Sequence, residues 1–297
     1  MNILVIGHSV VDKIIDKDSI SIKPGGIFYT VVSLLSQLQS EDKLYLCSSI
    51  DEKNEILFKD AYDRIEREFL NYVDSIPKVE LVVHLTGERK ETYSQTAQNL
   101  LLPADDLNRF DGILINMISG FDVSLAQLKQ LRKNYSGCIY FDVHTFSRGV
   151  DKHLNRIFRR IADFNEWAEC IDLLQTNESE LLTLSDQVEE AAIVDELFSY
   201  GIKQIIITRA ERGATVFFRE NGSIRKIHKD ALQVKVSNKV GCGDVFGAVY
   251  FYNYIKNKNV LLALELANLF AGVATTYSEA KDFLNLKRDA NERICKK

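Results

Sequence analysis

Short apolar segments alternate with amphipathic segments along almost the whole 297-residue chain. The continuously apolar runs lie at 3–7, 44–50, 112–118, 138–143, 170–175 and 203–208. Runs without polar alternation are typical of strands that are covered on both faces. Apolar residues at helical spacing predict helices over 27–38, 55–70, 123–133, 152–168 and 186–200. This order predicts an α/β fold, namely a doubly wound, mostly parallel sheet with helices on both faces.

Two segments, at approximately 13–24 and 79–98, depart from this pattern. In the first, a short alternation over 19–23 is closed by Pro24 and two glycines. The second has the pattern of a β-hairpin with Gly87 in the turn. We expect both to form a small sheet outside the main one. No linker or internal repeat is visible, so the sequence predicts one α/β domain over 1–297 with these strands inserted in it.

Composition excludes several classes of protein. The net charge is −5, from 37 basic and 42 acidic residues, which argues against nucleic-acid binding. The basic run at 152–160 is interpreted as the solvated face of a helix. We expect no membrane span, and a first strand rather than a signal peptide at the N-terminus. Five scattered cysteines fit a reduced, cytoplasmic protein, and the five histidines show no zinc-ligand spacing.

The segment with most chemical content is Gly241-Cys242-Gly243-Asp244, a Gly-x-Gly turn that leads into an apolar helical run. Such turns direct successive backbone N–H groups at one point, and a helix N-terminus adds partial positive charge there. An aspartate beside an anion site fits a base that deprotonates a hydroxyl as it attacks a phosphoryl group. A plain loop-to-helix connection is the alternative.

This segment resembles the signature of the ribokinase-like (PfkB) sugar-kinase family, Asp-Thr-x-Gly-Ala-Gly-Asp. The second half matches, whereas Asn238 and Lys239 stand where the family has Asp and Thr. The resemblance implies that Asp244 is the catalytic base, that the amides of 241–243 form an anion hole, and that the two inserted segments are a lid over the sugar. Because the first Asp of the signature helps to bind a monovalent cation in many relatives, Asn238 implies weak or absent potassium activation.

The resemblance also places an acceptor site near the N-terminus. Asp12, just past the first predicted strand, corresponds to an aspartate that binds sugar hydroxyls, for which a carboxylate is well suited. Gly25 and Gly26 match the family's glycine pair. Thr30 occupies the position of a substrate-binding asparagine, so the chain departs from the family there and ribose is in doubt as the acceptor. A solvated loop aspartate is the alternative for Asp12.

Further matches lie on the nucleotide side. Asn177 and Glu180 fit an Asn-x-x-Glu motif, in which Glu180 acts on Mg²⁺ through water; helix capping by Thr176 or Asn177 is compatible with that role. The family's Thr-x-Gly-x-x-Gly and adenine-flanking residues are matched by Thr208, Gly213 and Asn268, with Ala210 in place of a glycine. Arg209 is either a phosphate ligand or a surface charge.

One further position is ambiguous. Asp142 matches an Asp-Pro-Asn-x-Arg segment of many relatives, in which His144 replaces the asparagine and Arg148 is out of register. This leaves His144 as a candidate substrate contact, although a lone histidine is more often structural.

The implied function is an ATP- and Mg²⁺-dependent kinase for a sugar or sugar-like small molecule, of divergent sequence. Two alternatives within the family are a nucleoside kinase and a catalytically weak pseudokinase that binds a sugar or nucleoside. A dinucleotide-binding enzyme is disfavoured, because residues 7–12 lack Gly-x-Gly-x-x-Gly. An exposed lid sheet could pair with that of a second subunit to form a homodimer.

Overall fold

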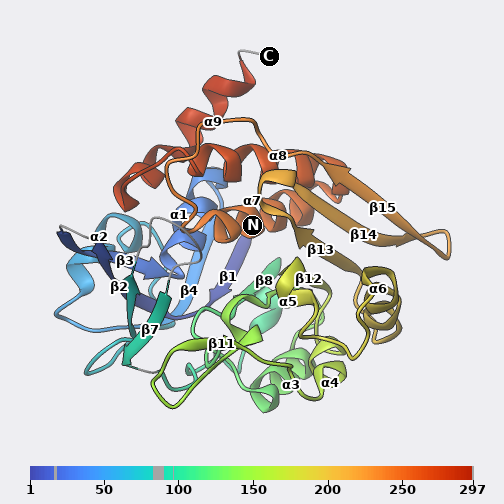
Figure 1. The fold of residues 1–297 in the computed structure, drawn as a ribbon, viewed down its shortest axis with the longest axis horizontal. Coiled ribbons are helices and arrows are strands. Elements are labelled where there is room, and N and C mark those ends of the chain that lie inside the picture. Colours follow the sequence, from blue (N-terminus) through green and yellow to red (C-terminus); the bar gives the residue numbers. More distant parts are fainter. Residues whose placement is uncertain (17–18, 83–89, 96, 296–297) are drawn as a thin grey trace.

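The computed structural model describes residues 1–16, 19–82, 90–95 and 97–295. Its centre is a nine-stranded sheet of order β15-β14-β13-β12-β9-β8-β1-β4-β5 (Figure 1). The strands are β1 Asn2–Ile6, β4 Lys43–Ile50, β5 Leu70–Tyr72, β8 Gly112–Asn116, β9 Cys138–Asp142, β12 Leu173–Asn177, β13 Gln204–Thr208, β14 Ala214–Glu220 and β15 Ser223–Lys229. Strands β5 to β13 in this order are parallel, and β14 and β15 add an antiparallel edge.

Both faces of the sheet are buried, as the continuous apolar strands predict. In β1, Ile3 and Val5 pack into one hydrophobic core, and Leu4 and Ile6 pack into the other. Figure 1 shows the two helical layers on opposite sides. The first layer holds α1 Phe28–Gln37, α2 Glu55–Tyr62, α7 Cys242–Asn257, α8 Val260–Ala274 and α9 Leu286–Ile294. The second holds α3 Leu125–Asn134, α4 Phe164–Ala168, α5 Glu178–Leu181 and α6 Glu190–Ser199. The predicted fold class is confirmed.

The helix predicted over 152–168 is wrong in its first two thirds. There the chain forms a hairpin of β10 Arg148–Val150 and β11 Arg156–Phe158, and only α4 is helical. The Asp151 carboxylate accepts the backbone N–H groups of residues 153 and 155 and so closes a tight turn. Ile157 and Phe158, which have helical spacing, are 49% and 44% exposed and contribute little to a core.

Two smaller differences concern the edges of the sheet. The helix predicted over 55–70 ends at Tyr62, and the chain then returns to the sheet as β5. The antiparallel edge strands β14 and β15 have no counterpart in the sequence prediction. In β15 only Ile224 and Ile227 are apolar, and Ile224 is 38% exposed. The strand therefore lacks the continuous apolar run that is typical of a buried strand.

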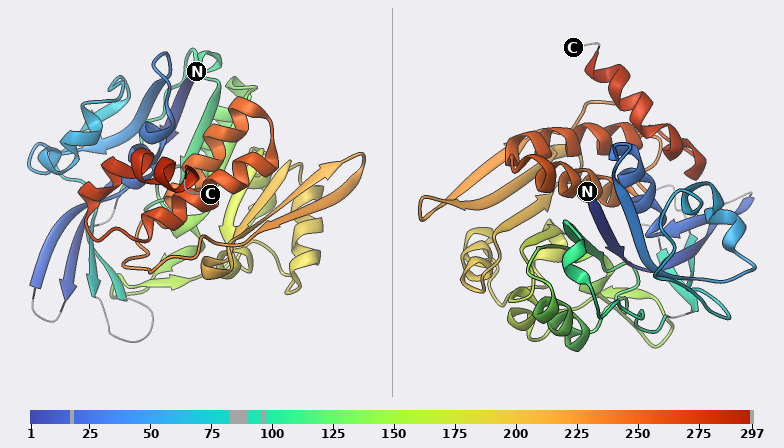
Figure 2. Two further views of the ribbon diagram at one scale, coloured as in Figure 1. Left: turned by 90° about the horizontal axis from the view of Figure 1, so that it is seen from above. Right: turned by 180° about the vertical axis from the view of Figure 1, so that it is seen from behind.

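The predicted lid is a four-stranded sheet of order β3-β2-β6-β7. Its strands are β2 Ser9–Asp16, β3 Ser19–Gly26, β6 Lys78–Val82 and β7 Lys90–Gln95. Figure 2 shows them projecting from the central sheet. Strand β2 begins four residues earlier than predicted, so Asp12 lies within a lid strand rather than in a loop. The predicted turn at Gly87 lies outside the described residues.

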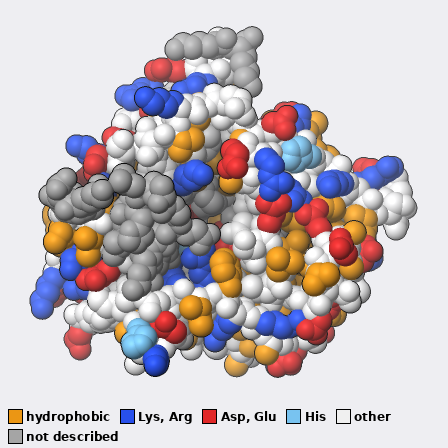
Figure 3. Space-filling model, viewed as in Figure 1, with side chains coloured by type: hydrophobic (Ala, Val, Ile, Leu, Met, Phe, Trp, Pro, Cys, Tyr) orange, Lys and Arg blue, Asp and Glu red, His pale blue; other side chains and the backbone are white. Residues whose placement is uncertain are grey.

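Among the described residues no helix is both long enough and apolar enough to cross a membrane. On the face shown in Figure 3, basic and acidic side chains are interleaved rather than gathered in separate areas.

A buried His8–Asp122 pair joins the end of β1 to the loop after β8. The Nδ1 of His8 lies 2.9 Å from the Asp122 carboxylate, and its Nε2 lies 3.0 Å from the carbonyl oxygen of Gln98. Asp122 also accepts the N–H groups of His8, Ser119 and Gly120. Burial acts to raise the pKa of Asp122, but the His8 charge and these hydrogen bonds hold it below its usual value.

We predict that Asp122→Ala lowers the free energy of unfolding by about 3–5 kcal/mol, because it leaves His8 and three amides without their buried acceptor. Urea denaturation measures this. Asp195→Asn, on the exposed side of α6, is the matched control and should change the value by less than about 0.5 kcal/mol. Equal effects of the two substitutions would contradict a special role for the pair.

Candidate functional site

Asp244 lies at the third residue of α7, beyond the carboxyl edge of the parallel sheet. Gly241 precedes the helix with φ +77°, and a Cβ at this glycine would lie 2.5 Å from the Tyr29 ring. The turn is therefore restricted to glycine by both its conformation and its contact. It directs Asp244 inward, and that residue is only 7% exposed.

Asn116, the last residue of β8, connects the sheet to this aspartate. Its Nδ2 donates to Asp244 Oδ1 at 2.6 Å and to Thr30 Oγ1 at 3.1 Å. Asn116 is 1% exposed, and its Oδ1 has no hydrogen-bond partner among the described residues. The sequence analysis missed Asn116. Its position at the carboxyl end of a predicted parallel strand was a usable signal.

A cavity of about 60 Å³ lies between the lid and the start of α7, and we call it the lid cavity. It is lined by Val10, Asp12, Gly26, Tyr29, Val79, Leu81, Ile118, His144, Arg156, Val240, Gly241 and Asp244. The structure thus brings Asp12, Gly26 and Gly241 to the same cavity as Asp244, along with the candidate contact His144. The volume suffices for a few water molecules.

Two predicted acceptor residues lie behind the cavity. A Cβ at Gly25 would overlap the carboxyl group of Asp12, so this glycine makes room for that carboxylate across the β2–β3 pair. Thr30 is buried in α1, and its Oγ1 accepts a hydrogen bond from the same Asn116 amide that donates to Asp244. Arg156, by contrast, was not predicted at all, because its segment was assigned to a helix face.

Two further carboxylates, Asp142 and Glu180, lie near Asp244. Burial, together with the charges of Glu180 and Asp244, raises the pKa of Asp142 well above its usual value. Burial also raises the pKa of Glu180 to about 7, against the lowering effects of its hydrogen bonds to Asn177 and of the Arg148 charge. Gln175 ties this group to α7, since its Nε2 donates to Asp142 at 2.7 Å and to the Gly243 carbonyl at 3.2 Å.

Asn177 and Glu180 form a reciprocal capping box at the start of α5. Asn177 Oδ1 accepts the Glu180 N–H, and Glu180 Oε2 accepts the Asn177 N–H, both at 2.9 Å. The capping interpretation is therefore present in the structure. In the described part of the chain, no three His, Cys, Asp or Glu residues are grouped to hold a metal ion directly. The action of Glu180 on Mg²⁺ through water stays a prediction.

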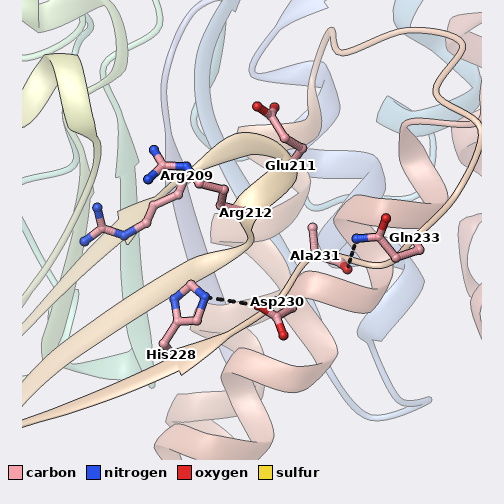
Figure 4. Close-up of a pocket in the computed structure, with 7 residues that line it drawn as sticks. All are labelled: Arg209, Glu211, Arg212, His228, Asp230, Ala231 and Gln233. Atoms are coloured by element: carbon pink, nitrogen blue, oxygen red, sulfur yellow. Dashed lines mark hydrogen bonds and ion pairs between the residues drawn. The ribbon is translucent and has the colours of Figure 1, made fainter.

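The predicted phosphate side lies at the end of β13. Thr208 ends that strand, and Gly213 ends the short turn that follows it. A cavity of about 570 Å³ opens beside this turn (Figure 4). Arg209 lines it, but its guanidinium pairs with Glu178 at 2.7 Å and Glu190 at 2.6 Å, so its charge is already balanced. It is a partly buried ion-pair residue, with a side chain that is 11% exposed.

Asn268 lies in a second cavity, of about 520 Å³, against α8. Its Nδ2 donates to the carbonyl oxygen of Lys229 at 3.1 Å. The two large cavities share Asp230, Ala231 and Gln233, the segment that Figure 4 shows between the turn and α8. Gly213 and Asn268 therefore border one stretch of chain, apart from the lid cavity, and Thr208 pairs with Ala214 next to Gly213.

Comparisons with known proteins agree with this geometry. A family model described as pfkB family carbohydrate kinase matches residues 151–286. A ribokinase of Thermotoga maritima superposes with a TM-score of 0.77 over 99% of both chains, at 17% identity. Residues 151–286 therefore match the PfkB family, and the chain as a whole has the fold of ribokinases. The matched residues include Asn177 and Asp244, but neither Asp12 nor Gly25.

Two other relatives extend the comparison. The chain is 29% identical to a deoxyribokinase of Salmonella typhi over 124 residues, which are 39% of this chain and 38% of the relative's length. Ribokinase II of E. coli, solved with ATP and Mg²⁺, superposes with a TM-score of 0.75 at 16% identity, over 98% of this chain and 99% of its own. At such identities the structural matches show the fold.

We predict that the free energy of unfolding falls as pH rises from 4.5, the usual pKa of Glu180, through about 7, its pKa in the folded protein. Between these values the folded state holds a proton that the unfolded chain has released, so ionisation at higher pH disfavours folding. Urea denaturation in Mg²⁺-free buffer at several pH values measures the slope.

Glu180→Gln should flatten this slope, whereas Glu189→Gln, at an exposed position before α6, should leave it intact. Parallel pH profiles for the native protein and Glu180→Gln would contradict the assignment.

Proposed function

We propose that this protein is a kinase that transfers the γ-phosphoryl group of ATP to a hydroxyl of a sugar or sugar-like small molecule. The observation that carries the proposal is the position of Asp244, which lines the lid cavity at the N-terminus of α7 beside Asp12. A hydroxyl held by Asp12 would be within the same enclosed space as a carboxylate base, and the helix N-terminus favours the negative charge of the transferred group.

In the proposed reaction, Asp244 accepts the proton of the acceptor hydroxyl as its oxygen bonds to the γ-phosphorus. The bond between that phosphorus and the bridging oxygen of ATP breaks, and ADP leaves. Asn116 holds one carboxylate oxygen of Asp244 and so orients the carboxylate for this step. The lid strands exclude water, which would otherwise compete as the acceptor.

The backbone amides at the start of α7 are proposed to bind the transferred phosphoryl group. They belong to Gly241, Cys242 and Gly243, which lead into Asp244. The Cys242 amide also makes a long bond of 3.4 Å to the carbonyl oxygen of Lys239, and a phosphoryl oxygen could replace this weak partner. Neutralising the charge of that group is the dominant contribution in phosphoryl transfer.

The oxygen donors near Asp244 fit Mg²⁺, a hard cation that keeps several of its waters. Burial and the Glu180 charge raise the pKa of Asp142, and burial and the Asp244 charge raise the pKa of Glu180, so a divalent cation nearby would favour both ionised forms. Asn177 and Glu180 would hold its waters, and the ion would supply charge neutralisation at the donor phosphates. The nucleotide would extend toward Thr208, Gly213 and Asn268, beside the two large cavities.

The similarity to a deoxyribokinase supports a sugar as the acceptor. A nucleoside acceptor is the alternative within the same proposal. Thr30 is not among the residues that line the lid cavity, and it contacts Asn116 beside Asp244. Asn238 Oδ1 accepts the Val240 N–H at 3.0 Å within the loop before α7. This neutral contact supports the inference that the protein does not depend strongly on potassium.

We predict that Asp244→Asn lowers kcat by about a hundred- to ten-thousandfold, the usual scale for loss of a general base. A coupled ADP-release assay with ATP, Mg²⁺ and a panel of sugars and nucleosides measures this. Near-normal turnover in the variant would refute the assigned base. Absence of turnover in the native protein, with ATP or a sugar still raising Tm, would favour the pseudokinase.

We further predict that Asn116→Ala lowers kcat by about ten- to a hundredfold with little change in KM, since it removes a hydrogen bond to a charged group. As a positioning residue, Asn116 should also affect the pH profile: the acidic limb of kcat/KM should move to higher pH when the donor is lost. Asn257→Ala, at the far end of α7, is the control. An unchanged profile would mean that Asn116 only supports the fold.

A further inference from the structure

The lid cavity contains a basic side chain that the proposed chemistry does not use. Arg156 lies on β11, in the hairpin that replaces the predicted helix, and lines the cavity together with Asp12 and Asp244. Proton removal and hydroxyl binding require the two carboxylates, but neither step requires a guanidinium in this position.

The guanidinium is held firmly by the lid. It lies over the ring of Tyr93 in β7, 4.6 Å from the ring centroid, and its Nη2 donates to the Tyr93 hydroxyl at 2.8 Å. Tyr93 is 2% exposed, and its hydroxyl donates to the Ser119 carbonyl at 3.0 Å. A side chain fixed in this way loses little conformational entropy when it binds a ligand.

The hairpin itself is attached to the same lid strand. The Tyr93 N–H donates to the Leu154 carbonyl at 3.1 Å, and the Thr92 hydroxyl donates to Asn155 Oδ1 at 3.1 Å. Arg156 therefore belongs to the hairpin and lid strands around the proposed acceptor site. In this position it would contact the acceptor rather than the nucleotide.

Much of the remaining cavity wall is apolar, with Val10, Val79, Leu81 and Ile118 among its side chains. Such a wall provides no hydrogen bonds for a fully hydroxylated sugar on that side. The carboxylates of Asp12 and Asp244 repel negative charge, so an anionic group on the acceptor would be accommodated at Arg156.

We propose that the acceptor carries an anionic group, a carboxylate or a phosphate, which the guanidinium of Arg156 binds through paired hydrogen bonds. The acceptor would then be a sugar acid or a sugar phosphate. Planar, two-point recognition of such oxygens is the characteristic interaction of arginine. This inference rests on the proposed function, because it assigns the lid cavity to the acceptor.

The test measures binding by calorimetry and turnover by ADP release for the full chain. The ligands form two matched sets: ribose, ribonate and ribose 5-phosphate, and glucose, gluconate and glucose 6-phosphate. The variants are Arg156→Gln and Arg156→Lys, with Lys152→Gln as a control that removes one charge from the exposed turn of the same hairpin. Tm for each variant reports whether it folds.

We expect at least one anionic ligand to bind more tightly than its neutral counterpart. Arg156→Gln should weaken that binding about ten- to a hundredfold, the scale of a hydrogen bond to a charged group, and Arg156→Lys should restore part of it. Neutral ligands and Lys152→Gln should show little change. Comparing the affinities for the sugar acids with those for the sugar phosphates shows whether the site prefers a carboxylate or a phosphate.

Preference for neutral ligands, or an equal loss for neutral and anionic ligands in Arg156→Gln, would overturn the inference and leave Arg156 as a support of the lid. If Arg156→Gln fails to fold, Arg156→Lys is compared with the native protein instead. A loss of affinity confined to anionic ligands would then support the inference, and an equal loss for neutral ligands would overturn it. Arg156-dependent anion binding without any turnover would support this inference while refuting the proposed kinase activity.

Discussion

The hydrogen bond from Asn116 to Asp244 joins the two halves of the candidate site. Asn116 ends a strand at the middle of the sheet, and Asp244 begins the helix that packs across it. A buried carboxylate is costly unless polar groups surround it, and here the amide of Asn116 and the first turn of α7 supply them. That contact fixes one carboxylate oxygen of Asp244 relative to the sheet.

The negative charge gathered around this contact gives the site its chemical character. Asp142, Glu180 and Asp244 approach each other closely enough for burial and mutual repulsion to raise the pKa of the first two. Proteins retain such arrangements at sites that bind cations or transfer protons. The helix N-terminus beside them favours the opposite charge, so cation and phosphoryl group would meet at one place.

The lid shows how a second sheet completes a site that the first sheet cannot enclose. Strand β2 places Asp12 in the lid cavity, β7 holds Arg156 through Tyr93, and the hairpin β10–β11 closes the same side. Residues that are far apart in the sequence thus line one small cavity, whose shape depends on how their elements are joined.

The sequence by itself determined the doubly wound sheet, the lid and the glycine turn before Asp244, because apolar periodicity and glycine placement are local signals. It also pointed to Asp12 and to the capping box of Asn177 and Glu180. Only the tertiary structure decided that Asn116 contacts Asp244, that Arg209 is neutralised by two glutamates, and that residues 148–158 form a hairpin carrying Arg156 into the cavity. These features depend on partners that are distant in sequence. The segment around Arg156 has apolar residues at helical spacing, but the turn closed by Asp151 and the pairing with β7 override that local preference.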